Sequence, residues 1–193
     1  MTHVTTAEPG PADDLLVVAN TRHGPGGHYR VRALADGPDH DHLRDAADAL
    51  AYLVDHHVPV PAGLPDPEAL GRMATLRDLV RRIARDRAPG AAPAVPPAEQ
   101  EIASALGDAG FRITSAGVVP LRDGWPGFVD GLLPGLLELR RDAARLRVCA
   151  NPRCRFAFLD RSRNRSRIWC ETAVCGNRIR VGRHRRRALH RSP

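Results

Sequence analysis

The sequence predicts an α+β protein, with a mostly α-helical N-terminal domain that includes a short β-hairpin and a small cysteine-rich C-terminal module ending in a basic helix. Apolar residues recur at helical spacing in several segments before residue 145. All four cysteines lie between positions 149 and 175, and the chain after them is rich in arginine. We therefore expect one domain over residues 1–145 and a second over 146–190.

The N-terminal domain opens with an apolar run. Leu15–Ala19 predicts a short buried strand or another buried apolar segment. Three polar residues follow it, namely Asn20, Thr21 and Arg22. They are candidates for the wall of a small-molecule pocket, and a hydrogen-bonded strand end is the alternative.

Three helices are predicted next. The first covers roughly 39–57, with Asp39 or Asp41 as its cap. The second covers about 66–87, because Asp66 can cap a helix that has proline at its first position. A proline-rich linker at 88–97 separates it from a short third helix around Ile102.

A hairpin and a last helix complete the domain. The strands are expected at 111–113 and 118–121, with a turn at 115–117. The helix is expected at about 126–145, where Pro134 should kink or interrupt it.

Histidines flank the first predicted helix. His40 and His42 lie near its start, and His56 and His57 lie at its end. Helix ends about 20 Å apart cannot share one ion, so we expect a solvated pair at each end. The sequence contains no nucleophile elbow, dinucleotide fingerprint or paired-carboxylate motif, and we do not expect an enzyme.

Charge is divided unevenly along the chain. The 193 residues include 29 basic residues, all arginine, and 22 acidic ones, for a formal net charge of +7. Residues 149–193 contribute 13 arginines against two acids, a net charge of +11, and residues 1–148 carry −4. Such a segment indicates a polyanionic partner, usually nucleic acid, and a solvated basic tail is the alternative.

Cysteine spacing predicts order in the basic segment. Cys149 and Cys154 form one pair with four intervening residues, and Cys170 and Cys175 form another. Two such pairs can surround one tetrahedral Zn²⁺, and four cysteine ligands make a closed structural site. Disulfides are the alternative and require an oxidising compartment, for which we find no signal peptide.

Two elements are predicted around the metal. Phe156 and Phe158 alternate with other residues before a turn at 160–164, and Ile168–Trp169 returns to Cys170, so a hairpin should pack under the ion. A proline-free stretch from Gly176 to about residue 190 predicts a helix.

Helical winding divides this last helix into two faces. One face, expected to lie toward the metal module, holds Cys175, Ile179, Gly182, Arg186 and Leu189. The candidate nucleic-acid-binding residues are Arg163, Arg165 and Arg167 in the turn, and Asn177, Arg178, Arg180, Arg183, His184 and Arg187 in the helix. Arginines on a helix suit the major groove of DNA, and a solvated helix face is the alternative.

The cysteine-rich segment resembles the CGNR zinc-finger family, which is named for the residues found here at Cys175–Arg178. In that family the finger follows an N-terminal ABATE domain, whose members tend to carry an Asn-Thr pair after an apolar run, as at Asn20–Thr21. The resemblance implies a bacterial transcription regulator in which the finger binds DNA and the remainder has a sensing or dimerising role.

We therefore expect a DNA-binding regulator with one structural Zn²⁺, located in the cytoplasm on the nucleoid and not in a membrane. The alternatives are a zinc protein that binds structured RNA, and an effector-binding protein whose zinc module contacts another protein. A homodimer would enlarge the small footprint of one finger.

Overall fold

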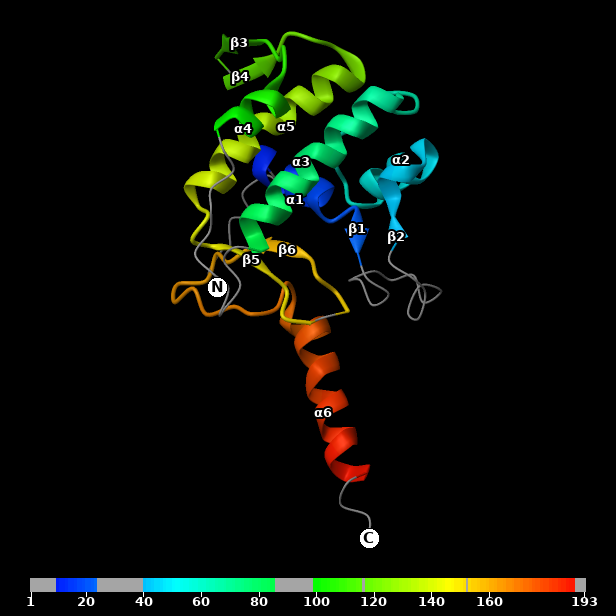
Figure 1. Ribbon diagram of the computed structural model, residues 1–193, viewed down its shortest axis with the longest axis vertical. Helices are drawn as coiled ribbons and strands as arrows, with labels where there is room; N and C mark the ends of the chain where they lie inside the picture. The colour runs from blue at the N-terminus through cyan, green and yellow to red at the C-terminus, as the bar shows by residue number, and fades with distance from the viewer. Residues whose placement is uncertain (1–9, 24–39, 86–98, 116, 152, 190–193) are drawn as a thin grey trace, which may run out of the picture.

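Three helices form the centre of the N-terminal domain. The computed structural model describes residues 10–23, 40–85, 99–115, 117–151 and 153–189. Helix α1 (Pro11–Ala19) packs against both α3 (Pro67–Arg85) and α5 (Gly124–Arg141), and α3 also contacts α5 (Figure 1). Fully buried side chains from all three, including Leu15, Met73 and Leu139, make the core.

The first apolar run is helical, so the predicted strand at Leu15–Ala19 is wrong. Pro11 occupies the first turn of α1, and the Asp13 carboxylate accepts from the backbone N–H of Gly10 at 3.3 Å. Leu15 and Val18 are buried at helical spacing. Five apolar residues in a row fit a strand or a buried helix, and here the capping residues before them favour the helix.

The first predicted helix begins later than expected. Residues His40–Asp41 form β2, which pairs antiparallel with β1 (Arg22–His23), and a 3₁₀ turn follows at His42–Arg44. Helix α2 spans Ala46–Asp55, and its N-cap is Asp45, whose carboxylate accepts from the Asp48 N–H at 2.9 Å. Asp41 caps the 3₁₀ turn instead, and Asp39 lies outside the described residues.

The second and third predicted helices are confirmed. Asp66 caps α3 through a 2.7 Å hydrogen bond from the Ala69 N–H, and α4 covers Glu99–Leu106. The predicted linker at 88–97 lies outside the described residues. Strands β3 (Phe111–Thr114) and β4 (Gly117–Pro120) form the expected antiparallel hairpin, at the opposite end of the molecule from the C-terminal helix 177–189 (Figure 1).

Helix α5 continues through Pro134, so this proline does not interrupt it. The next residue explains how α1 and α5 approach each other closely. A Cβ at Gly135 would collide with the backbone of Pro11, and only glycine leaves room for that contact.

The chain then enters the cysteine-rich module, which shares its first strand with the main core. Strand β5 (Leu146–Val148) pairs antiparallel with β6 (Ala157–Leu159), and Leu146 and Ala157 are buried in the large hydrophobic core. The predicted strand partner of the Phe156–Phe158 segment was Ile168–Trp169, which is not a strand, so that pairing is wrong.

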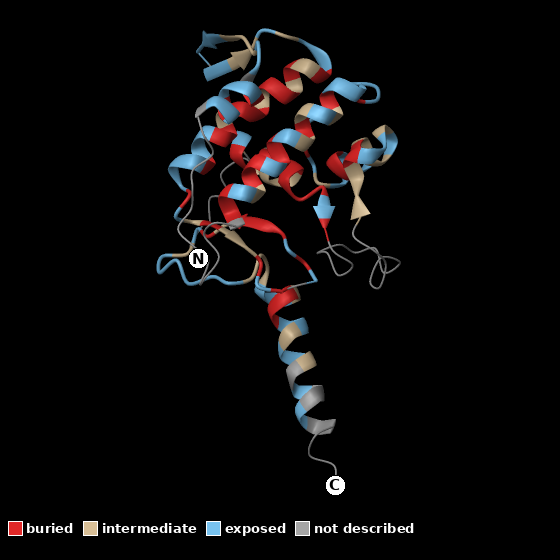
Figure 2. Ribbon diagram, viewed as in Figure 1, coloured by how far each residue is buried: buried red, intermediate tan, exposed pale blue. Residues whose placement is uncertain are grey.

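The last helix, α6 (Asn177–Leu189), extends away from the rest of the molecule (Figure 1). Buried residues are concentrated in the N-terminal helices and continue to Cys175 and Gly176 in the turn before α6, whereas the described residues of α6 are exposed or intermediate (Figure 2). Among the described residues, no helix is both long and apolar enough to cross a bilayer.

Candidate metal centre and nucleic-acid interface

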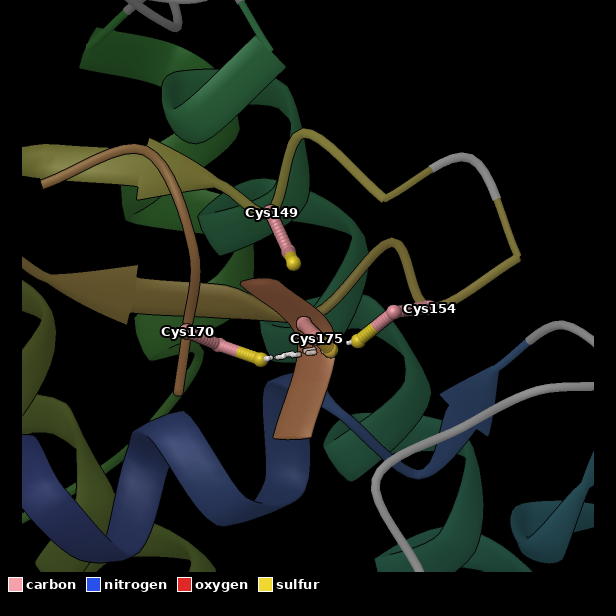
Figure 3. Close-up of side chains that lie close together, drawn as sticks. All are labelled: Cys149, Cys154, Cys170 and Cys175. Carbon is pink, nitrogen blue, oxygen red and sulfur yellow. Dashed lines mark hydrogen bonds between the residues drawn. The ribbon is translucent and has the colours of Figure 1, made fainter. Parts of the chain in front are cut away.

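Four segments of the C-terminal module bring their cysteines to one point (Figure 3). Cys149 directly follows β5, and Cys154 ends the turn that leads toward β6. Cys170 lies after the arginine-containing loop, and Cys175 lies in a π-helical turn, Thr172–Gly176, that continues into α6. The four sulfur atoms all lie within 4.8 Å of one another.

The spacing of these sulfurs fits a tetrahedral zinc site. The Sγ atoms of Cys154 and Cys170 are 3.6 Å apart, and those of Cys170 and Cys175 are 3.7 Å apart. A Zn²⁺ ion bound at about 2.3 Å by four sulfurs separates them by about 3.8 Å. All four cysteines are free thiols and none is in a disulfide, so the four donors support one structural zinc ion.

Electrostatics also indicate a cation at this point. Hydrogen bonds from the Cys154 and Cys170 thiols lower the pKa of Cys149. The same contacts with Cys149 raise the pKa values of Cys154 and Cys170, and burial raises that of Cys175. Four sulfurs at this separation, three of them on buried cysteines, cannot all ionise without a positive charge between them, and a divalent metal would supply that charge.

Apolar packing and one glycine shape the surroundings of the sulfurs. Phe156 and Phe158 are buried with the cysteines, and Trp169 packs against this cluster. A Cβ on Gly176 would lie 3.1 Å from the indole of Trp169, so glycine at this position lets the ring approach the turn that carries Cys175.

The structure places the predicted helical residues immediately beyond the metal site. Cys175 is buried, Ile179 and Gly182 are half-buried, and Arg180, His184 and Arg187 are exposed. Asn177 and Arg178 are exposed in the first turn of α6. Arg183, Arg186 and Leu189 belong to the helix, but their side chains lie outside the described part of the chain.

The other predicted arginines belong to a loop organised by Asp160. The buried Asp160 carboxylate accepts from the Ser162 N–H at 3.0 Å, from the Ser162 hydroxyl at 2.5 Å and from the Arg167 N–H at 3.0 Å. Burial alone would raise the pKa of Asp160, but these hydrogen bonds outweigh it and lower the pKa. Arg163 and Arg165 are exposed on this loop.

The guanidinium of Arg167 is hydrogen-bonded to the backbone of the finger itself. It donates to the carbonyl oxygens of Trp169, at 3.0 Å, and of Cys170, and it lies 5.3 Å from the centre of the Phe158 ring. The side chain thus braces the segment that delivers a zinc ligand, a role that sequence spacing does not reveal.

The three candidate pocket residues separate in the structure. Asn20 is buried, and its side-chain amide is hydrogen-bonded to the backbone of Ala157. Asn20 also lines a pocket of about 430 Å³ between the N-terminal domain and the finger. Thr21 is buried, and its hydroxyl donates to the Val18 carbonyl at 2.7 Å. Arg22 is exposed, and its carbonyl accepts from Arg81.

The histidine arrangement differs from the expected solvated pairs. His40 and His42 both contact the carboxylate of Asp48, and His23 lies against His42. Sequence reasoning missed His23 and Asp48. The antiparallel pairing of β1 with β2, which sets His23 opposite His40, is the contact that joins them.

Two family models match the chain. Residues 15–149 match the ABATE model, whose description is "Putative stress-induced transcription regulator", and residues 145–188 match the CGNR zinc finger. The two matches overlap where β5 leads into Cys149. No curated protein matches the chain.

Proposed function

The chain belongs to the ABATE family and carries a CGNR zinc finger, and from this premise we propose that it is a transcription regulator that binds duplex DNA through α6. The observation that carries the proposal is the position of this helix. α6 begins two residues after the zinc ligand Cys175 and extends away from the molecular body with exposed arginines (Figures 1 and 2). The metal therefore sets the origin and direction of a cationic helix.

Charge supports a nucleic-acid partner. Glu171 is the last acidic residue of the chain, so α6 has no carboxylate of its own to pair with its arginines. Arg180, His184 and Arg187 are exposed along the helix. Arginine heads can bind phosphates or form bidentate hydrogen bonds to guanine in the major groove, which is wide enough for an α-helix.

The arginine loop offers a second contact. Arg163 and Arg165 are exposed, and we propose that they bind phosphates beside the groove that α6 enters. Arg167 stays with the finger backbone and supports the shape of the loop. Phosphate contacts of this kind position a protein on DNA, whereas base contacts from the helix select the sequence.

Fluorescence anisotropy with zinc-loaded full-length protein tests the proposal. Duplex DNA selected from a random pool is compared with duplex RNA of the same sequence at several salt concentrations. We expect tighter binding to DNA, because the deep, narrow major groove of A-form RNA excludes a helix. Affinity should fall steeply with salt, since about six neutralised phosphates release their counterions.

Single substitutions locate the interface. If Arg180 or Arg187 contacts a base, its substitution by alanine should weaken DNA binding by about 1–3 kcal/mol. If it contacts a phosphate, the slope of log affinity against log salt concentration should fall in magnitude by about 1. The matched control is Arg112→Ala, which removes the same charge from an exposed position on β3, far from α6. Equal losses in all three variants, preference for RNA, or binding that is insensitive to salt would refute the proposal.

A further inference from the structure

A second group of metal-ligating side chains lies in the N-terminal domain, apart from the cysteines. His40 on β2, His42 in the 3₁₀ turn and Asp48 on α2 each present one ligand atom, and these atoms all lie within 4.8 Å of one another. His40 Nε2 lies 2.6 Å from Asp48 Oδ2, and His42 Nδ1 lies 2.9 Å from Asp48 Oδ1. Each carboxylate oxygen therefore faces one imidazole.

We propose that His40, His42 and Asp48 form a second metal site that binds one divalent transition-metal ion. Two imidazoles and one carboxylate are donors that zinc and its neighbours in the first transition row accept. When an ion binds, each neutral ring coordinates it through the nitrogen that now faces Asp48, and the single ring proton moves to the other ring nitrogen. Three protein ligands leave further positions to water.

His23 prepares His42 for this role. The Nε2 atoms of the two rings are 3.1 Å apart, and His23 is buried. When His42 carries its proton on Nε2, it donates to His23 and leaves the Nδ1 lone pair directed at the proposed ion. Metal-binding histidines commonly donate their second ring N–H to a neighbouring group, which fixes both tautomer and ring orientation.

Neighbouring groups leave the three ligands available. The nearby carboxylate of Asp41 is engaged by Arg77 at 2.6 Å, so it does not compete for the ion. The side chains of His40 and Asp48 are 38% and 36% exposed, which gives an ion access from solvent. The His42 side chain is 12% exposed and is held between Asp48 and His23.

The site is distinct from the cysteine site but adjoins the finger. The ring of His23 lies 5.9 Å from the ring of Phe156, which packs among the cysteines. Thiolates and imidazole–carboxylate sets give different cobalt spectra, because only thiolates produce sulfur-to-cobalt charge-transfer absorption. Co²⁺ is therefore a probe that separates the two sites.

The test titrates Co²⁺ into tag-free full-length protein that holds one Zn²⁺ per chain. We expect one further equivalent to bind, with visible d–d absorption and no sulfur-to-cobalt band. His40→Ala and Asp48→Asn should each weaken this binding about tenfold or more while the zinc content stays at one per chain. Both positions are partly exposed, and Asn preserves the size of Asp48, so melting temperature checks that the variants fold.

The matched control is His57→Asn, which removes an exposed histidine at the other end of α2. His57 has a φ of 59°, a backbone conformation that asparagine tolerates. This variant should bind Co²⁺ as the unmodified chain does. The proposal is overturned if no second equivalent of Co²⁺ binds or if the only cobalt absorption comes from the cysteines. It is also overturned if His40→Ala and Asp48→Asn bind Co²⁺ as tightly as the unmodified chain, and His40, His42 and Asp48 then form only a hydrogen-bonded cluster.

Discussion

The side chain of Asn20 binds the backbone of Ala157, which lies 137 positions further along the chain. Asn20 Nδ2 donates to the Ala157 carbonyl oxygen at 2.9 Å, and the Ala157 N–H donates to Asn20 Oδ1 at 2.8 Å. Both hydrogen bonds are buried. They join the end of α1 to β6 and thereby hold the finger on the N-terminal domain.

Loss of the two Asn20–Ala157 hydrogen bonds should loosen the contact between the N-terminal domain and the finger. Asn20→Ala leaves the N–H and carbonyl of Ala157 buried without these partners, and we expect a loss of about 2–3 kcal/mol in unfolding free energy. Denaturant unfolding measures the loss, and amide hydrogen exchange at Ala157 should accelerate. The control is Asn164→Ala, at an exposed asparagine of the finger. Unchanged exchange at Ala157 in Asn20→Ala would contradict the clamp.

Two glycines should respond in opposite directions to alanine. Gly135→Ala places a Cβ against the backbone of Pro11, so α1 and α5 must move apart at an expected loss of about 1–3 kcal/mol. Gly71→Ala, on the exposed side of α3, meets no atom within 4 Å and should stabilise the protein by about 0.5–1 kcal/mol. Thermal and denaturant unfolding measure both. Equal effects of the two substitutions would show that helix propensity alone governs these sites.

Acid should weaken the domain through Asp130. This fully buried carboxylate binds Arg72 at 2.7 Å and Arg122 at 2.6 Å. Burial alone would raise the pKa of Asp130, but the two arginines outweigh it and hold the pKa below 3.8. Because the pKa is lower in the folded state, the stability it contributes is present above about pH 4 and is lost as pH falls through the folded pKa.

The substitution Asp130→Asn tests this assignment. At pH 7 it removes the buried charge partner of Arg72 and Arg122, and Arg122 keeps only a 3.4 Å contact with the exposed Asp108, so we expect a loss of about 3–5 kcal/mol. Unfolding free energies measured from pH 7 to pH 3 should show the gap between the two proteins narrowing below about pH 4. A gap that stays constant over this range would assign the pH dependence to other groups.

Asp160 should control the shape of the arginine loop. Asp160→Ala removes the acceptor of three hydrogen bonds, and we expect a loss of about 2 kcal/mol and faster amide exchange at Arg167. If the loop binds phosphates, DNA affinity should fall although every arginine remains. The control is Asp108→Ala, whose side chain is 91% exposed. If amide hydrogen exchange at Arg167 is the same in Asp160→Ala as in the unmodified chain, Asp160 does not control the shape of the loop.

Zinc removal should unfold the finger and spare the helical core. The two tryptophans report on the two parts, because Trp125 is buried in the large core and Trp169 packs beside Cys170. In Trp125→Phe, chelation should shift the remaining emission to longer wavelength as Trp169 becomes solvated. In Trp169→Phe, the emission of Trp125 should stay unchanged. Equal shifts in both variants would mean that the domains unfold together.

Much of the fold follows from local patterns. Asp66 and Pro67 mark the start of α3, and β3 and β4 are visible as a hairpin, because caps and turns depend on residues that are close in sequence. The same logic failed at Leu15–Ala19, where five apolar residues do not distinguish a strand from a helix. It also failed for β6, whose partner is β5 and not Ile168–Trp169.

The sequence by itself determined the zinc ligands and the charge of the finger helix, since paired cysteines and a run of arginines are local features. Only the tertiary structure decided that Asn20 clamps Ala157, that Arg167 braces the finger backbone, and that His23 meets His42 beside Asp48. The Asn20–Ala157 and His23–His42 contacts join segments 137 and 19 positions apart. The Arg167 and Asp48 contacts are close in sequence, but they depend on how the loop and the 3₁₀ turn fold. The physical reason is that strand pairing and core packing choose the distant partners and that loop conformation orients the near ones, and local spacing encodes neither.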